Sequence, residues 1–301
     1  MQRLLVNILV LTIVNSAVFV AELTAQSYAS KKKATSVTRI GVVVPDIRQA
    51  ATAYATILGI DVPAITSIFS NDLASRFEVA DLQLENITIQ LLQPLETTSK
   101  LYRDFVEKDR HGVHHLSVLS NDASGFSYLG EELGLFVNYS PDRTALDAKT
   151  RYTFGLPTCI THIGIAVTDI QRSREALSQI FDVTPTPIQE FDEPNGRAAF
   201  TVFNLDNVSL ELLQQIGDGT YNSFINEYGQ GAHHIGLDLR RPTGSLTMEA
   251  QLDWLRKNGG ANHVTSDSFV YIDFQSVLGL FVEALPIAVN EQIYPHPHRS
   301  H

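Results

Sequence analysis

The stretch Ile160-Thr161-His162-Ile163-Gly164-Ile165-Ala166-Val167 decides the fold of this chain, and Thr168-Asp169-Ile170 follows it directly. A short and nearly continuous apolar run of this kind predicts a buried strand. The polar residues after it predict the start of a helix, because Thr and Asp side chains accept hydrogen bonds from the first free backbone N–H groups. One residue does not suit a buried strand, namely His162. What the chain does depends on whether this histidine has partners.

The strand and the helix start that follows it occur twice in the chain. Ile40 to Ile47 matches Ile163 to Ile170, Gln90 to Gln93 matches Glu211 to Gln214, and His114 to Val118 matches His233 to Leu237. The three matches come in the same order, at offsets between 119 and 123 residues. Such a regular offset indicates an internal duplication. The boundary between the two repeats is expected near Leu156-Pro157-Thr158.

Each repeat is predicted to contain two smaller units, each built from a strand, a helix and about three further strands. Helices are predicted at 47–58 with Asp46 as N-cap, after a Thr168-x-x-Gln171 capping box, and at 246–257. Alternating strand patterns occur at 197–204, 208–214, 269–274 and 280–285. The predicted fold class is therefore α+β, with curved mixed sheets around a cavity and helices outside.

The two ends of the chain are expected to lie outside the folded modules. Met1-Gln2-Arg3 precedes a mostly apolar run from Leu4 to Ala21, which predicts a signal peptide or an uncleaved membrane anchor, with a linker, over residues 1–36. A secreted or periplasmic protein is expected, with a membrane-anchored one as the alternative. Residues 37–156 are the first predicted module, 157–287 the second, and 288–301 a disordered tail.

The charge and the composition of the chain restrict the kinds of partner that it can bind. A net charge of −11 without a basic stripe argues against nucleic acid. The single cysteine, Cys159, rules out an intrachain disulfide. A small-molecule substrate is the expected partner. The chain is expected to be a monomer or a homodimer, with no membrane contact beyond the N-terminal anchor considered above.

Four polar residues interrupt apolar strands of the second repeat: His162, Glu211, His234 and Glu283. Burying a lone carboxylate costs several kcal/mol. Convergence on one divalent metal ion would offset that cost, and these donors suit Zn, Ni, Co, Mn or Fe. Taken singly, each histidine could equally be a satisfied core residue, and Glu211 could face solvent across the pleat. The joint site is favoured because the spacing of 49 residues from His162 to Glu211 recurs from His234 to Glu283.

The runs 162–167, 211–213, 233–235 and 281–283 resemble the four metal-ligand strands of the vicinal oxygen chelate superfamily, which includes glyoxalase I, methylmalonyl-CoA epimerase and extradiol dioxygenases. The resemblance covers residues 37–286, and 211–234 is most similar to the epimerases. It implies paired βαβββ units, a cupped site and a divalent metal that binds substrate oxygens and stabilises an enolate. The corresponding positions of the first repeat are Arg39, Gln90, His115 and Phe154. The first module is therefore expected to be metal-free, because an arginine cation cannot ligate a metal.

The number of protein ligands separates the reaction types. Four ligands leave two positions of an octahedral metal for adjacent substrate oxygens, which suits an isomerase, epimerase or lyase acting on a small carbonyl compound. Resemblance to glyoxalase I implies that Glu283 would then also take the proton next to the carbonyl. Two histidines and one carboxylate would instead suit an Fe(II) extradiol-type ring-cleaving dioxygenase. Glu211 decides between the two, and a non-catalytic small-molecule binding protein is a second alternative.

Overall fold

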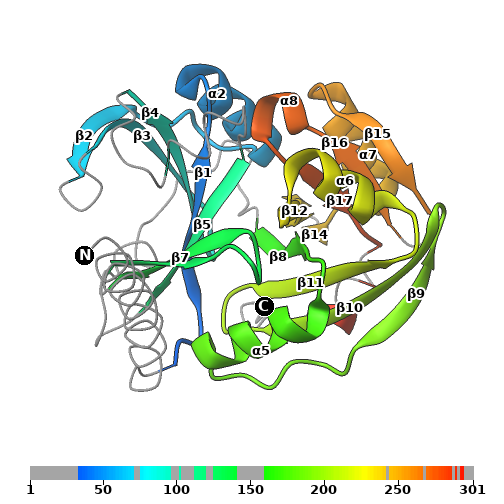
Figure 1. The fold of residues 1–301 in the computed structure, drawn as a ribbon. Helices are drawn as coiled ribbons and strands as arrows, with labels where there is room; N and C mark the ends of the chain where they lie inside the picture. The colour runs from blue at the N-terminus through cyan, green and yellow to red at the C-terminus, as the bar shows by residue number, and fades with distance from the viewer. Residues whose placement is uncertain are drawn as a thin grey trace, which may run out of the picture.

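The computed structural model describes residues 33–70, 75–95, 102, 112–119, 125–140, 159–241, 244–266, 269–286, 289 and 292–294. The apolar N-terminal run and the predicted repeat boundary lie outside these residues. Within them, no helix combines the length and the apolar character needed to cross a membrane. The described chain forms two curved mixed sheets that lie side by side, with helices packed against them (Figure 1).

The first sheet has seven strands in the order β2-β3-β4-β1-β5-β7-β6. Its elements are β1 (Val37–Val43), α2 (Ile47–Leu58), β2 (Thr66–Ser70), β3 (Ser75–Gln83), β4 (Thr88–Pro94), β5 (Gly112–Leu119), β6 (Gly125–Leu129) and β7 (Leu135–Ser140). β1 lies between β4, to which it is parallel, and β5, to which it is antiparallel. The predicted unit of strand, helix and three strands is confirmed for β1 to β4. The unit from β5 to β7 has no helix among its described residues, and only residues 120–124 separate β5 from β6.

The second sheet has eight strands in the order β15-β16-β17-β12-β8-β11-β10-β9. Its elements are β8 (Cys159–Ala166), α5 (Ile170–Ile180), β9 (Gln189–Glu193), β10 (Gly196–Asn204), β11 (Ser209–Ile216), α6 (Thr220–Tyr228), β12 (Gly231–Asp238), α7 (Met248–Lys257), β15 (Ala261–Thr265), β16 (Val270–Asp273), α8 (Gln275–Leu278) and β17 (Phe281–Ala284). A two-stranded hairpin of β13 (Arg240–Arg241) and β14 (Gly244–Ser245) precedes α7. β8 lies between parallel β11 and antiparallel β12, as β1 lies between β4 and β5. The duplication predicted from the sequence is therefore a duplication of sheet topology.

The starts of the two equivalent helices differ in one detail from the prediction. Asp46 caps α2 as expected, because its carboxylate accepts hydrogen bonds from the N–H groups of Arg48 and Gln49. In α5 the N-cap is Asp169 and not Thr168. The hydroxyl and N–H of Thr168 instead donate to the side chain of Gln230, which directly precedes β12. A tertiary contact thus removes Thr168 from the capping role that its spacing to Gln171 suggested.

Two buried asparagines hold the two modules together. Asn86 lies in the turn between β3 and β4, and its amide donates to the carbonyl of Ile160 in β8 at 2.7 Å and accepts from the Ile160 N–H at 3.3 Å. Asn207 lies in the turn between β10 and β11 and makes the same pair of bonds with Val37 in β1, at 2.7 and 3.2 Å. Each amide also donates to the backbone carbonyl of the other asparagine, at 2.7 Å. The first strand of each module is therefore tied to a turn of the other module.

The helices add a second set of contacts between the modules. α2 lies beside α8 (Figure 1), and the hydroxyl of Tyr54 donates to the carbonyl of Leu278 at 3.0 Å. The indole of Trp254 donates to the carbonyl of Ile57 at 2.9 Å. Apolar residues from both sheets form one continuous buried core between them. The opposite face of each sheet does not take part in this core.

Candidate metal centre

The four predicted ligands lie on four neighbouring strands of the second sheet. His162 is on β8, Glu211 on β11, His234 on β12 and Glu283 on β17. Side chains alternate along a strand, so when Ile163 faces the core, His162 faces the opposite side, which we call the inner face. All eight residues of β8 are buried, which means that the inner face is covered as well as the core face.

The register of the strands brings these side chains to one place. Gly164 pairs with both Glu211 and His234, and Gly236 pairs with both His162 and Glu283. Each imidazole then lies across a glycine of the neighbouring strand. A Cβ built on Gly164 would lie 2.1 Å from Cε1 of His234, and one on Gly236 would lie 2.1 Å from Cε1 of His162. The two glycines therefore make room for the two rings.

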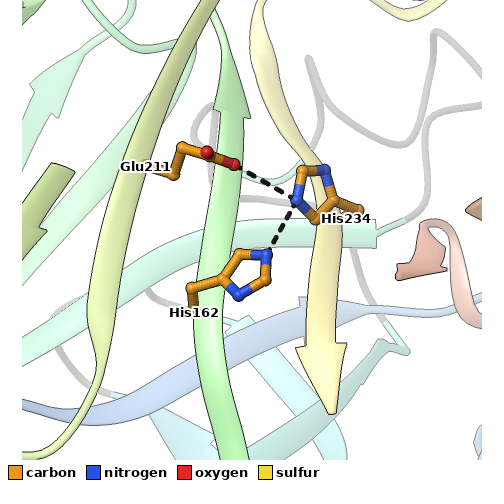
Figure 2. Close-up of side chains that lie close together, drawn as sticks. All are labelled: His162, Glu211 and His234. Atoms are coloured by element: carbon orange, nitrogen blue, oxygen red, sulfur yellow. Dashed lines mark hydrogen bonds and ion pairs between the residues drawn. The ribbon is translucent and has the colours of Figure 1, made fainter. Parts of the chain in front are cut away.

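Donor atoms of His162, Glu211 and His234 converge (Figure 2), and Glu283 lies beside the two imidazoles. The ligand atoms of His162, Glu211 and His234 lie within 4.8 Å of one another. Nε2 of His162 lies 3.0 Å from Nε2 of His234, and Nε2 of His234 lies 3.5 Å from Oε2 of Glu211. Oε2 of Glu283 lies 2.8 Å from Nε2 of His162 and 3.7 Å from Nε2 of His234. The structure thus brings His162, Glu211 and His234 into one cluster and places Glu283 next to both imidazoles, while their role as metal ligands stays a prediction.

Neighbouring polar groups hold the two imidazoles by their outer nitrogens. Nδ1 of His162 lies 3.0 Å from the hydroxyl oxygen of Thr161, and Nδ1 of His234 lies 3.0 Å from Nδ1 of His233. Both Nε2 atoms are thereby turned toward the common point. A partner on the far nitrogen is typical of metal-binding histidines, because it fixes the tautomer and the orientation of the ring.

Burial and the neighbouring charges shift the pKa values of three of these side chains. Burial lowers the pKa of His162 to about 4, against the opposing charge of Glu211, so its imidazole is neutral at pH 7. Burial raises the pKa of Glu283 to about 8; the charge of Glu211 adds to this effect and that of His234 opposes it. Burial also acts to raise the pKa of Glu211, but hydrogen bonds from His234 and Tyr294 and the imidazole charges outweigh it, so that pKa is lowered.

The arrangement fits a divalent metal ion by two separate observations. Donor atoms about 2.1 Å from a metal lie roughly 3.0 to 3.4 Å apart in octahedral or tetrahedral geometry, and the contacts of 2.8 to 3.7 Å between these side chains span that range. In addition, Oε2 of Glu283 is buried without a hydrogen bond among the described residues, although Nε2 of His162 lies 2.8 Å away. A buried carboxylate oxygen in that state lacks a partner, which a cation would supply.

Tyr294 belongs to this site, and the sequence analysis did not find it. Its ring is 3% exposed and stacks on the ring of His162 with centroids 3.9 Å apart. Its hydroxyl donates to Oε1 of Glu211 at 2.9 Å. The tail from residue 288 was expected to be disordered, and that expectation is wrong for Tyr294, since Val289 and Ile293 also pack on the core beside the site. An apolar pair, Ile293-Tyr294, ahead of the polar end was the available signal.

We expect Tyr294→Phe to weaken metal binding about tenfold while the ring stays in place. The phenol orients Glu211, and loss of a group that orients a ligand typically costs 10–100-fold in affinity. Competitive titration with a metal indicator measures the change. Tyr228→Phe, on α6, is the matched control, because its ring is less buried and lies outside the ligand cluster. Equal affinity in both variants would contradict an orienting role for Tyr294.

We expect Gly164→Ala to displace the ring of His234 and to reduce metal binding. The new methyl group would overlap the imidazole, and overpacking of this kind costs about 1–3 kcal/mol. Gly41→Ala is the matched control: a Cβ there would lie 1.9 Å from Cε1 of His115, the equivalent histidine of the first module. Thermal unfolding should show a lower Tm for both variants, while only Gly164→Ala should lose metal. Full metal content in Gly164→Ala would count against the geometry described above.

The first module carries different residues at three of the four equivalent positions. Gly41 pairs with Gln90 and His115, as Gly164 pairs with Glu211 and His234. The first three positions are therefore Arg39, Gln90 and His115, as predicted. The fourth prediction is wrong: Ser117 pairs with Asn138 as Gly236 pairs with Glu283, so Asn138 and not Phe154 is the equivalent residue. Phe154 lies outside the described residues.

Within the described residues, the chain is a duplicated curved sheet whose second copy carries a buried cluster of two histidines and two carboxylates. The chain belongs to the Glyoxalase/Bleomycin resistance protein/Dioxygenase superfamily, whose sequence model matches residues 38–151 and 161–269. The two matched segments correspond to the two sheets. Members of this superfamily include the enzymes named in the resemblance above, and they commonly bind a divalent metal ion.

The similar solved structures have low sequence identity to this chain, and two of them share its fold at TM-scores of 0.57 and 0.50. A variant of 4-hydroxymandelate synthase from Streptomyces coelicolor has a TM-score of 0.57 and 13% identity, with 86% of this chain and 99% of that chain covered. A xylose isomerase-like TIM barrel/4-hydroxyphenylpyruvate dioxygenase fusion protein has a TM-score of 0.50 and 14% identity, with 88% and 52% covered. A variant of Streptomyces coelicolor methylmalonyl-CoA epimerase has a TM-score of 0.33 and 20% identity, with 42% and 91% covered. No curated protein matches the sequence.

Proposed function

We propose that the second module is a divalent-metal-dependent enzyme of the isomerase, epimerase or lyase type, acting on a small carbonyl compound with two adjacent oxygens. One observation carries the proposal: both carboxylates adjoin the two histidines. Glu211 shares one cluster with them, and Oε2 of Glu283 lies 2.8 Å from Nε2 of His162 and 3.7 Å from Nε2 of His234. Four such donors would leave a six-coordinate metal two positions for substrate oxygens. Two histidines with a single carboxylate would favour oxygen chemistry instead.

Each side chain has a distinct task in this proposal. His162, His234 and Glu211 would hold the metal, which when bound would polarise the substrate oxygens. Glu283 would also hold it, and on releasing the metal its carboxylate would take the proton from the carbon next to the carbonyl and return it to the substrate. Without a metal, burial raises the pKa of this carboxyl group to about 8, so the released carboxylate would be a stronger base than an exposed one. The rings of Tyr294 and Tyr271 cover the histidines and exclude water from the proton transfer.

A dioxygenase is the second candidate, and a specific observation favours it. Tyr294 donates to Oε1 of Glu211 and could hold that carboxylate back from a metal. His162, His234 and Glu283 would then remain as a set of two histidines and one carboxylate, which suits Fe(II). Glu283 is within 3.7 Å of both imidazoles, so this reduced set is compact.

Proton exchange separates the two candidates. Hydroxyacetone has adjacent carbonyl and hydroxyl oxygens, and we expect the metal-loaded protein to exchange its carbon-bound protons in D₂O, followed by proton NMR. Glu283→Gln should lose this exchange, whereas Glu175→Gln, an exposed change on α5, should keep it. Oxygen uptake with catechols and Fe(II), together with unaltered hydroxyacetone, would instead establish the dioxygenase. Absence of stoichiometric metal in the purified protein would rule out both candidate functions.

A further inference from the structure

In the first module, the residues at the positions equivalent to the metal cluster carry different charges. Where the second module has His162, Glu211 and Glu283, the first has Arg39, Gln90 and Asn138. Two carboxylates are thus replaced by neutral carboxamides, and an imidazole donor is replaced by a fixed guanidinium cation. Positions that suit a cation in the second module suit an anion in the first, because the only permanent charge among the four is positive.

No ion pair of Arg39 occurs among the described residues. Its Nε is buried there without a hydrogen-bond partner. His115 beside it is neutral, because burial, together with the charges of His114 and Arg39, lowers its pKa well below the usual value. The amide of Gln90 donates to the exposed carboxylate of Asp81 at 2.9 Å. A partly buried guanidinium is unfavourable when no counter-ion lies nearby. An anionic ligand beside Arg39 would therefore be stabilising.

The face of β1 that carries Arg39 also carries an apolar and aromatic cluster. Arg39 and Val43 alternate onto this face, and Val43 belongs to a buried cluster with Phe77, Val79, Leu92 and Tyr102, against which Phe126 packs. The ring of His114 stacks between Tyr102 and Phe136, with centroid distances of 4.2 and 4.6 Å. The cation and the aromatic cluster therefore share one face of the first sheet.

We propose that the inner face of the first module binds a small carboxylate with an aromatic body, with the carboxylate paired to Arg39 and the ring against the aromatic cluster. A planar guanidinium matches a carboxylate with two parallel hydrogen bonds. The amides of Asn138 and Gln90 lie at the flanking positions. A single cation with neutral neighbours suits a monoanion better than phosphate. This binding site is separate from the metal cluster and needs no metal.

Calorimetric titration of the full chain with benzoate, after metal removal with EDTA, tests the proposal. We expect saturable binding that is at least about tenfold weaker in Arg39→Met. Arg48→Met, an exposed change on α2 that removes the same charge, should leave the affinity unchanged. Benzyl alcohol and inorganic phosphate should not compete. Absence of saturable benzoate binding, equal affinity in Arg39→Met and Arg48→Met, or displacement by phosphate would each overturn the proposal.

Two further measurements test whether Arg39→Met folds normally and whether benzoate binds to the first module. Thermal unfolding of ligand-free Arg39→Met should give a Tm equal to or above that of the unmodified chain, because the variant removes an unpaired buried charge. A lower Tm would mean that Arg39 has structural partners, and it would overturn the assignment. His234→Ala should bind benzoate with unchanged affinity. Loss of binding in that variant would place the carboxylate in the second module and overturn the proposal as well.

Discussion

Replacing His234 with alanine is expected to abolish stoichiometric metal binding, whereas replacing His115 with alanine leaves it intact. His234 approaches His162, Glu211 and Glu283 at 3.0, 3.5 and 3.7 Å, so it is the central donor of the cluster. Removing a group that only orients a ligand costs 10–100-fold in affinity, and we expect loss of the ligand itself to exceed about 100-fold. Metal content after dialysis and a competitive indicator titration both measure the change.

Comparing His234→Ala with His115→Ala controls for the loss of packing. His115 lies over Gly41 as His234 lies over Gly164, so both variants remove a buried ring from the same place in the fold. Losses in packing should therefore be similar. Added metal at 1,000 times its Kd should stabilise His115→Ala by about 4 kcal/mol and His234→Ala hardly at all. Equal metal-induced shifts in Tm would show that the metal lies elsewhere.

The metal cluster could be predicted because it follows from a periodic pattern. Side chains alternate along each strand, so a polar residue in an apolar run marks the face opposite the core. The duplication then supplied the alignment of strands that a single copy lacks. It related Gly41 to Gly164 and hence Arg39 to His162, and the pairing of β1 and β8 agrees. The assignment of metal chemistry to the second module rests on this alignment.

Features set by distant segments could not be predicted in this way. Tyr294 reaches Glu211 across 83 positions of the chain, and no periodicity marks such a contact. Thr168 loses its capping role to a bond with Gln230 from another strand. Asn138 was missed because the second unit of the first module is shorter than its counterpart, so an offset taken from other strands points too far along the chain. In each case a tertiary contact or a length change overrides a local rule.

Replacing Asn207 with alanine is expected to lower the free energy of unfolding by about 3 kcal/mol or more. The change leaves the N–H and C=O of Val37 and the C=O of Asn86 without their partner. Each buried backbone group that loses its hydrogen bond costs about 1–3 kcal/mol. Denaturant unfolding followed by circular dichroism measures the effect. Asn262→Ala is the control, because Asn262 is exposed and its bond to Arg256 lies at the surface.

The symmetry of the contact makes a sharper test possible. Asn86→Ala should destabilise the chain by a similar amount, because its amide makes the same three bonds with Ile160 and Asn207. The double variant should lose less than the sum of the two single variants, since residues that share partners do not contribute independently. The loss of either asparagine alone should be enough to loosen the contact between the modules. Additive losses would mean that each turn docks on the other module independently, and the two modules would then unfold in separate steps.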